Sequence, residues 1–171
     1  SYTTWHIHIY CEYAMLCMST NDFDNAERIF KKVLSLNPNS ARTHKDLGVI
    51  YLNKRMFEYA KDEFEKAYEL DPENKDIIFE YANYLHATGD YVKADEMYKY
   101  ALSQTPEDAN FLTFAAKNKM NLNDNEAAYS MLLKALAKAP TSDFILFMVG
   151  KAAYLMKDYE NAKLYLVKAY E

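Results

Sequence analysis

Glycine, proline and cysteine are scarce in this chain of 171 residues, which contains 3 Gly, 4 Pro and 2 Cys. Because Gly and Pro form most tight turns, their scarcity excludes a fold with many β-hairpins and predicts an almost entirely helical protein. The two cysteines, Cys11 and Cys17, fall within one expected helix. They would lie roughly 9 Å apart along its axis, too far for a disulfide. We therefore expect reduced thiols and a cytoplasmic location.

A basic surface and a long apolar segment are also missing. The net charge is -5 and the pI is about 5.4, so we expect no nucleic-acid partner, because such a partner selects for a basic surface. The longest apolar run, residues 144–149, has six residues, far fewer than the ~18 of a membrane span. The chain has no initiator Met and ends before a fifth proline is due. We therefore expect a fragment of a longer protein.

What the chain does contain is a period of 34 residues, which separates its prolines, Pro38, Pro72, Pro106 and Pro140. One column of this period is always alanine: Ala26, Ala60, Ala94, Ala128 and Ala162. A second column is always small: Ala14, Gly48, Ala82, Ala116 and Gly150. A third is large: Phe30, Phe64, Tyr98, Leu132 and Leu166. Small residues facing large ones at a fixed period indicate closely packed helical hairpins stacked in a row.

These columns resemble the pattern of tetratricopeptide repeats, which the second repeat matches best with Leu47, Gly48, Tyr51, Ala60, Phe64, Ala67 and Pro72. The resemblance implies an all-α fold, a right-handed α-solenoid of helix-turn-helix hairpins. It divides residues 1–171 into one array of repeats, at 7–40, 41–74, 75–108, 109–142 and an incomplete 143–171, after an N-terminal extension at 1–6. The fourth repeat departs most, because Lys119 occupies an apolar column, and we expect a kink or polar opening there.

The residue pattern along the chain predicts two helices in each repeat. The first helices are expected at 7–20, 41–53, 75–88, 109–121 and 143–156, and the second at 24–36, 57–70, 91–104, 125–138 and 159–170. The turns at 19–22, 88–90 and 121–124 lie between paired helices and supply residues that tolerate the left-handed conformation at a helix end and then cap the next helix. Ser40 and Asn74 follow the prolines and provide acceptors that cap the next helix.

No residue pattern indicates catalysis. His8 and Cys11 are spaced to share a helix face and to bind a soft metal together, but a third ligand is not evident, and burial of the cysteines is the stronger interpretation. The acidic residues between 57 and 70 alternate with lysines, which is typical of a solvated helix face. We expect no enzyme, no metal and no cofactor.

The resemblance instead implies a concave groove lined by the first helix of each repeat. The columns predicted to face it contain Arg42, Lys45, Phe79, Asn83, His86, Phe114, Lys117, Phe147, Lys151 and Tyr154, with Phe144 in the same set of columns. Aromatic residues at helical spacing are more often core than ligand site. The carboxylate clamp known in this family is absent, because only Lys45 matches it.

The function expected from these features is a non-catalytic scaffold that binds a peptide segment or partner domain in the groove. Its aromatic and lysine residues favour a protein or peptide partner with bulky apolar and acidic side chains. Two alternatives stay open. One is a regulatory segment of a larger enzyme or signalling protein. The other is self-assembly as a homo-oligomer through the last helix, whose apolar residues are Tyr165, Leu166, Val167 and Tyr170.

Overall fold

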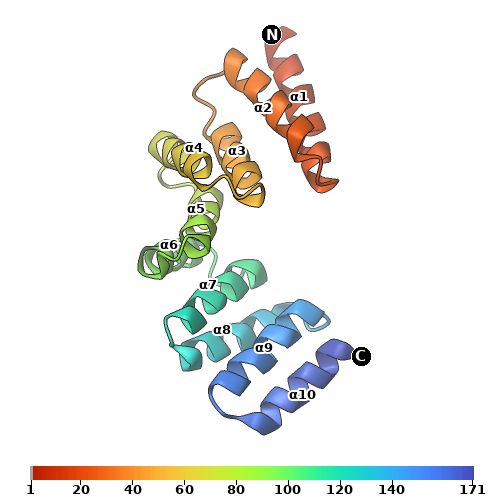
Figure 1. Cartoon of the computed structure of the whole chain (residues 1–171), viewed down its shortest axis with the longest axis vertical. Coiled ribbons are helices and arrows are strands. Elements are labelled where there is room, and N and C mark those ends of the chain that lie inside the picture. The colour runs from red at the N-terminus through yellow and green to blue at the C-terminus, as the bar shows by residue number, and fades with distance from the viewer. Residues whose placement is uncertain (1) are drawn as a thin grey trace. The chain divides into compact units, whose positions relative to one another are not determined.

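The computed structural model describes residues 2–171, with side chains from residue 5 onward. These residues form ten α-helices and no strand, as Figure 1 shows: α1 (Tyr2–Ser19), α2 (Phe23–Leu36), α3 (Ala41–Asn53), α4 (Phe57–Leu70), α5 (Lys75–Ala87), α6 (Tyr91–Gln104), α7 (Ala109–Asn121), α8 (Asn125–Lys138), α9 (Asp143–Leu155) and α10 (Tyr159–Tyr170). The predicted all-α array of hairpins is confirmed. The described part of the N-terminal extension continues α1 backward to Tyr2, and residue 1 lies outside the described residues.

The chain divides into two compact units, residues 1–84 and 85–171, with the boundary inside α5. In the first unit, α1 packs on α2, α2 on α3 and α3 on α4. In the second unit, each helix from α6 to α10 packs on the next, and α7 also contacts α9. The apolar core of the second unit lies where α7, α8 and α9 meet, around Leu112, Leu132 and Val149. Each unit therefore has its own interior, built from neighbouring helices.

The small columns of the sequence lie where helices of a hairpin meet. The five alanines of the invariant column are all buried. A Cβ atom added to Gly48 would lie 2.8 Å from Cε1 of Phe64, and one added to Gly150 would lie 2.7 Å from Cγ of Leu166. Because atoms cannot approach so closely without displacement, these glycines are needed for the contact between the two helices. The predicted pairing of small and large columns is confirmed.

Helix ends follow the predicted turn chemistry, with two exceptions. The Ser40 hydroxyl and the Asn74 side-chain oxygen accept backbone N–H groups at the starts of α3 and α5. Between paired helices, one residue in each expected turn adopts a positive φ angle: Asn21 at 57°, Gly89 at 90° and Asn123 at 60°. Arg55 and Lys157 do so as well, at 58° and 66°. Composition did not indicate these two positions, because neither residue type favours this conformation.

Lys119 does not interrupt the fourth repeat, so the expected kink is wrong. The α7 helix runs unbroken from Ala109 to Asn121, and Nζ of Lys119 lies 3.0 Å from a carboxylate oxygen of Asp95 on α6. At the corresponding place in the first unit, the Tyr51 hydroxyl donates to Glu27 at 3.2 Å. In each of these pairs, the two partners are 24 residues apart in the chain. In the fourth repeat, the ion pair between Lys119 and Asp95 replaces the contact that Tyr51 makes with Glu27, and α7 remains continuous.

Candidate functional site

The second unit presents a narrow aromatic stripe along α9. From residue 144 to residue 154 the exposed side chains are Phe144, Phe147, Lys151 and Tyr154, and every other residue in this stretch is buried. The three aromatic residues are 51%, 48% and 59% exposed. Their spacing of three, four and three residues places all four side chains on one side of the helix. Since large apolar side chains normally avoid such exposure, this stripe is a candidate contact surface.

Helix α7 carries two further residues of the predicted groove columns. Phe114 is half-buried and Lys117 is exposed, and α7 contacts α9 directly. Among the residues that the structure describes, neither Lys117 nor Lys151 forms an ion pair with a carboxylate. We call the following set the α7–α9 face: Phe114, Lys117, Phe144, Phe147, Lys151 and Tyr154. It combines exposed aromatic area with uncompensated positive charge.

A buried asparagine holds the predicted groove residue His86 in place. Asn118 on α7 is fully buried and donates its amide to the Tyr91 carbonyl at 2.8 Å, while its oxygen lies 3.0 Å from Nδ1 of His86. Burial lowers the pKa of His86; the hydrogen bond with Asn118 opposes this effect, and the charge of Lys117 adds to it. The hydrogen bond of His86 thus joins the end of α5 to α7, and the Asn118 amide joins α7 to the start of α6.

In the first unit, the positive groove residues are already paired. The Arg42 guanidinium lies 3.9 Å from Asp46, and Nζ of Lys45 lies 2.9 Å from the same carboxylate. Asp46 itself is 3% exposed. Because Asp46 compensates these cations, they offer less attraction to an acidic partner than the lysines of the second unit.

Phe79 and Asn83, the other two predicted groove residues of the first unit, are less exposed than a side chain that anchors a partner would be. Phe79 is 7% exposed, and the Asn83 amide donates to Glu80 at 3.2 Å. Burial raises the pKa of Glu80, although the Asn83 hydrogen bond and the nearby charge of Lys45 act in the opposite direction. This part of the predicted groove is thus polar, partly buried and internally bonded.

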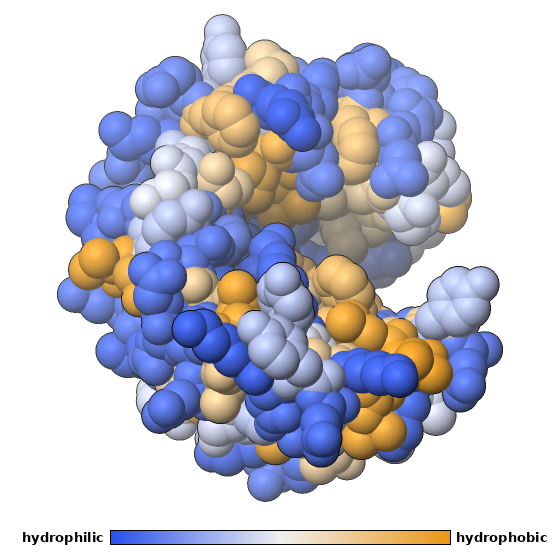
Figure 2. All heavy atoms as spheres, turned by 60° about the horizontal axis from the view of Figure 1, so that its bottom comes forward, coloured by the Kyte–Doolittle hydropathy of each residue, from blue (hydrophilic) through white to orange (hydrophobic). Residues whose placement is uncertain are grey.

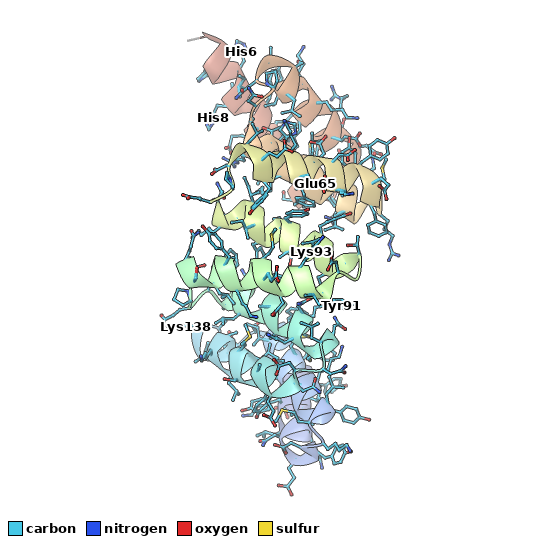
Figure 3. All side chains as sticks on the ribbon, turned by 90° about the vertical axis from the view of Figure 1, so that its left-hand side faces the viewer. His6, His8, Glu65, Tyr91, Lys93 and Lys138 are labelled. Atoms are coloured by element: carbon cyan, nitrogen blue, oxygen red, sulfur yellow. The ribbon has the colours of Figure 1, made fainter. Side chains whose placement is uncertain are left out.

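The predicted metal candidates do not come together with further ligands. His8 is exposed on α1, where Figure 3 labels it, Cys11 is half-buried and Cys17 is buried. Among the described residues, no group of three or more His, Cys, Asp or Glu side chains is placed to hold a metal ion. Both cysteines are free thiols.

The outer side of α10 forms a second exposed apolar surface, which we call the α10 face. Leu166 is 36% exposed, whereas its equivalents in the other repeats, Phe30, Phe64, Tyr98 and Leu132, are at most 1% exposed. A shallow depression of about 450 Å³ is lined by Tyr154, Tyr159, Ala162, Lys163, Leu166, Val167 and Tyr170. In Figure 2, which brings forward the end that carries α9 and α10, orange hydrophobic atoms are exposed among blue hydrophilic ones.

Sequence reasoning identified most of the α7–α9 face but could not rank its members. Phe144 and Phe147 fall in predicted groove columns, yet Phe79 occupies the same column as Phe147 and is buried. Tyr159 of the neighbouring α10 face, which contacts Tyr154 edge-on at 5.8 Å between ring centroids, was not among the predicted site residues. Only the exposure of the Tyr159 side chain marks it as part of a contact surface, and this exposure depends on the tertiary structure.

The family models agree with the repeat pattern and the helices. A model of the TPR domain of cytochrome c-type biogenesis protein H matches residues 34–146, and a model of a single tetratricopeptide repeat matches residues 7–40. The chain belongs to the tetratricopeptide repeat family. No curated protein sequence matches it, and no helix among the described residues is long and apolar enough to cross a membrane.

Solved structures of repeat proteins share the fold at low sequence identity. PilF of Pseudomonas aeruginosa is 18% identical with a TM-score of 0.88, covering 99% of this chain and 77% of that one. PilW, a type IV pilus biogenesis factor, is 17% identical with a TM-score of 0.89, covering 95% and 76%. YrrB, a TPR protein described as having an unusual peptide-binding site, is 23% identical with a TM-score of 0.74, covering 99% and 91%. At these identities the likeness establishes the fold alone.

Proposed function

We propose that this protein is a non-catalytic interaction scaffold whose second unit binds a protein or peptide segment on the α7–α9 face. The observation that carries the proposal is the row of exposed aromatic side chains on α9 beside two uncompensated lysines. Aromatic anchors contribute most of the binding energy at many interfaces, because they bury a large apolar area with few rotatable bonds.

The chemistry of the face specifies the partner. Phe114, Phe147 and Tyr154 favour bulky apolar side chains, and Lys117 and Lys151 favour Asp or Glu beside them. The predicted groove residues Arg42, Lys45, Phe79 and Asn83 stay a proposed contact surface of the first unit by itself, and His86 stays one of the second unit. Most of the binding energy is assigned to the second unit, because its charges are not already paired. The peptide-binding site named for YrrB supports a peptide as the class of partner.

Selection from a displayed random-peptide library tests this function without assuming a particular partner sequence. We expect peptides selected by the native chain to contain bulky apolar and acidic residues. Phe147→Ala should weaken their binding by about 2 kcal/mol, chiefly by faster dissociation. Lys117→Glu should mainly slow association and change its dependence on salt.

Tyr100→Ala provides the matched control, because Tyr100 is an aromatic residue of α6 that is 44% exposed and lies outside the face. Circular dichroism should show all three variants folded. If Phe147→Ala and Tyr100→Ala bind the selected peptides equally well, the α7–α9 face is not the binding site. A further variant, Phe114→Ala, should also stay folded; if it unfolds the fourth repeat, Phe114 belongs to the core and not to the binding face.

We also propose that the α10 face allows self-association. It is supported by the exposure of Leu166, whose equivalents are covered in every other repeat. Sedimentation should show association that increases with concentration and is weakened by Leu166→Lys. The control is Leu133→Lys on α8, because Leu133 is also 36% exposed. A strictly monomeric chain at high concentration would refute this second proposal.

A further inference from the structure

The exposed stripe of α9 has the spacing of a helix–helix seam. Phe144, Phe147, Lys151 and Tyr154 follow one another at intervals of three, four and three residues, which are the a, d, a and d positions of two heptads. At 1.5 Å per residue, the stripe is roughly 15 Å long. The residues beside it, including Ile145, are buried in the core of the second unit. On α9 itself the stripe is therefore one side chain wide, which suits a single elongated segment along the helix.

The length of the stripe distinguishes a helical partner from an extended one. In an extended segment, side chains on one side recur every ~6.8 Å, so four of them cover roughly 20 Å. In a helix that crosses α9 at about 20°, the a and d side chains recur with the same spacing as those of α9. A helix can thus place one side chain against each of the four positions along the stripe. An extended chain falls out of register by about 5 Å.

The charge within the stripe identifies one residue of the partner. Lys151 lies between Phe147 and Tyr154 and forms no ion pair with a carboxylate of the described chain. A partner helix that covered it with an apolar side chain would bury an ammonium group without compensation, which is unfavourable. A carboxylate at that position compensates the charge and, like other polar a-position residues, sets the register. Lys117 on α7 adds a second positive charge at the edge of the face.

We infer that the α7–α9 face binds an amphipathic helix with apolar residues at three successive heptad positions and a Glu or Asp opposite Lys151. This inference rests on the function proposed above and specifies its partner. Phe144, Phe147 and Tyr154 contact the apolar residues, and the ion pair with Lys151 fixes which of the possible registers is occupied.

A synthetic peptide of about two heptads tests the inference. The probe carries Leu at three of its four a and d positions, Glu at the central a position, Ala, Gln and Lys elsewhere, and a fluorescent label. A second peptide has the same seam residues but one Pro at a central outward position, which breaks the helix. We expect the native chain to bind the first peptide at least about tenfold more tightly than the second.

Charge reversal tests the role of Lys151. Lys151→Glu should weaken binding of the Glu peptide about tenfold and should strengthen binding of a peptide with Lys at that position, which restores the opposite charges. Lys134→Glu is the control, because Lys134 is an exposed lysine on α8 outside the face. Circular dichroism of both variants checks that the helices are retained.

The possible failures are distinguishable. Equal binding of the Pro peptide and the helical peptide would overturn the helical mode. The helical mode is also overturned if the helical peptide does not bind while library peptides bind in a Phe147-dependent way. Equal binding of peptides with Leu or Glu at the central position would overturn the assignment of the carboxylate. If no peptide from either source depends on Phe147, the proposed function itself is refuted.

Discussion

At the scale of single residues, two turns adopt a conformation that their side chains disfavour. Arg55 and Lys157 have φ angles of 58° and 66°, in a region that costs an L-residue roughly 1–2 kcal/mol unless it is Gly or Asn. The equivalent positions in other repeats are Asn21, Gly89 and Asn123. The chain therefore satisfies the turn requirement at three repeats and tolerates strain at two.

Arg55→Asn should relieve this strain. We expect the free energy of unfolding to rise by about 0.5–1 kcal/mol, because Asn adopts the left-handed region more readily than Arg. Urea titration followed by circular dichroism measures the change. Arg55→Ala provides the comparison, since alanine shortens the side chain without favouring a positive φ angle. Equal midpoints for the Asn and Ala variants would contradict the assignment of strain.

At the scale of the helical element, the contact between the two helices of a hairpin depends on a fixed small residue. Ala60 on α4 is fully buried, whereas the adjacent Lys61 is exposed. Ala60→Leu should destabilise the chain by about 1–3 kcal/mol by overpacking the contact with α3. Lys61→Leu should change stability by less than about 0.5 kcal/mol. Thermal denaturation of the two variants makes the comparison, and equal melting temperatures would show that the alanine column does not lie at the helix contact.

Successive repeats are joined by a charged contact whose strength depends on pH. The Glu27 carboxylate on α2 accepts hydrogen bonds from Lys31 at 2.6 Å and from Lys54 at 2.8 Å. Burial alone would raise the pKa of Glu27, but these two lysines outweigh it and lower the pKa to about 2. Because the folded value lies below the unfolded one, the contact stabilises the fold fully above about pH 4.5. This contribution is lost as the pH falls toward 2.

Glu27→Gln measures the contribution directly. We expect it to lower the free energy of unfolding by about 1 kcal/mol at pH 7, since a charged hydrogen-bond acceptor is replaced by a neutral one. The difference from the native chain should shrink between about pH 4.5 and pH 2, as the native carboxyl is protonated. Urea titrations at several pH values test this. A difference that stayed constant over that range would assign the effect to packing.

At the scale of the whole molecule, we expect stability to be the sum of contacts between neighbouring helices, because α1–α4 in the first unit and α6–α10 in the second pack mainly on the helices beside them in the chain. A local disturbance should therefore stay local. Ala128→Leu on α8, at a fully buried position, should increase hydrogen exchange of backbone amides in α7–α10 and leave α1–α3 nearly unchanged. Mass spectrometry of exchanged peptides resolves the two regions. A uniform increase along the chain would show one cooperative unit.

The fold was predictable because its information is repeated along the chain. A spacing of 34 residues, an alanine in every repeat and a proline at each complete junction indicated the hairpins. The predicted helices agree with the observed ones to within about two residues, except that α1 begins at Tyr2 and not at residue 7. Short-range chemistry of this kind depends on neighbours in the sequence. Lys119 led to the wrong expectation of a kink in the fourth repeat, because its ion-pair partner, Asp95, lies on the preceding helix and is not its neighbour in the sequence.

The sequence by itself determined the helices, their pairing and the columns in which a binding surface would lie. Only the tertiary structure decided which members of those columns are available. Phe79 and Phe147 share a column, but one is buried and the other exposed; Lys45 and Lys151 are both cations, but Asp46 pairs with the first alone. Exposure depends on atoms brought together from distant parts of the chain, and a local pattern does not contain it. Asp46 is the sequence neighbour of Lys45, so their pairing is local, but the burial of Asp46 is decided by the tertiary structure.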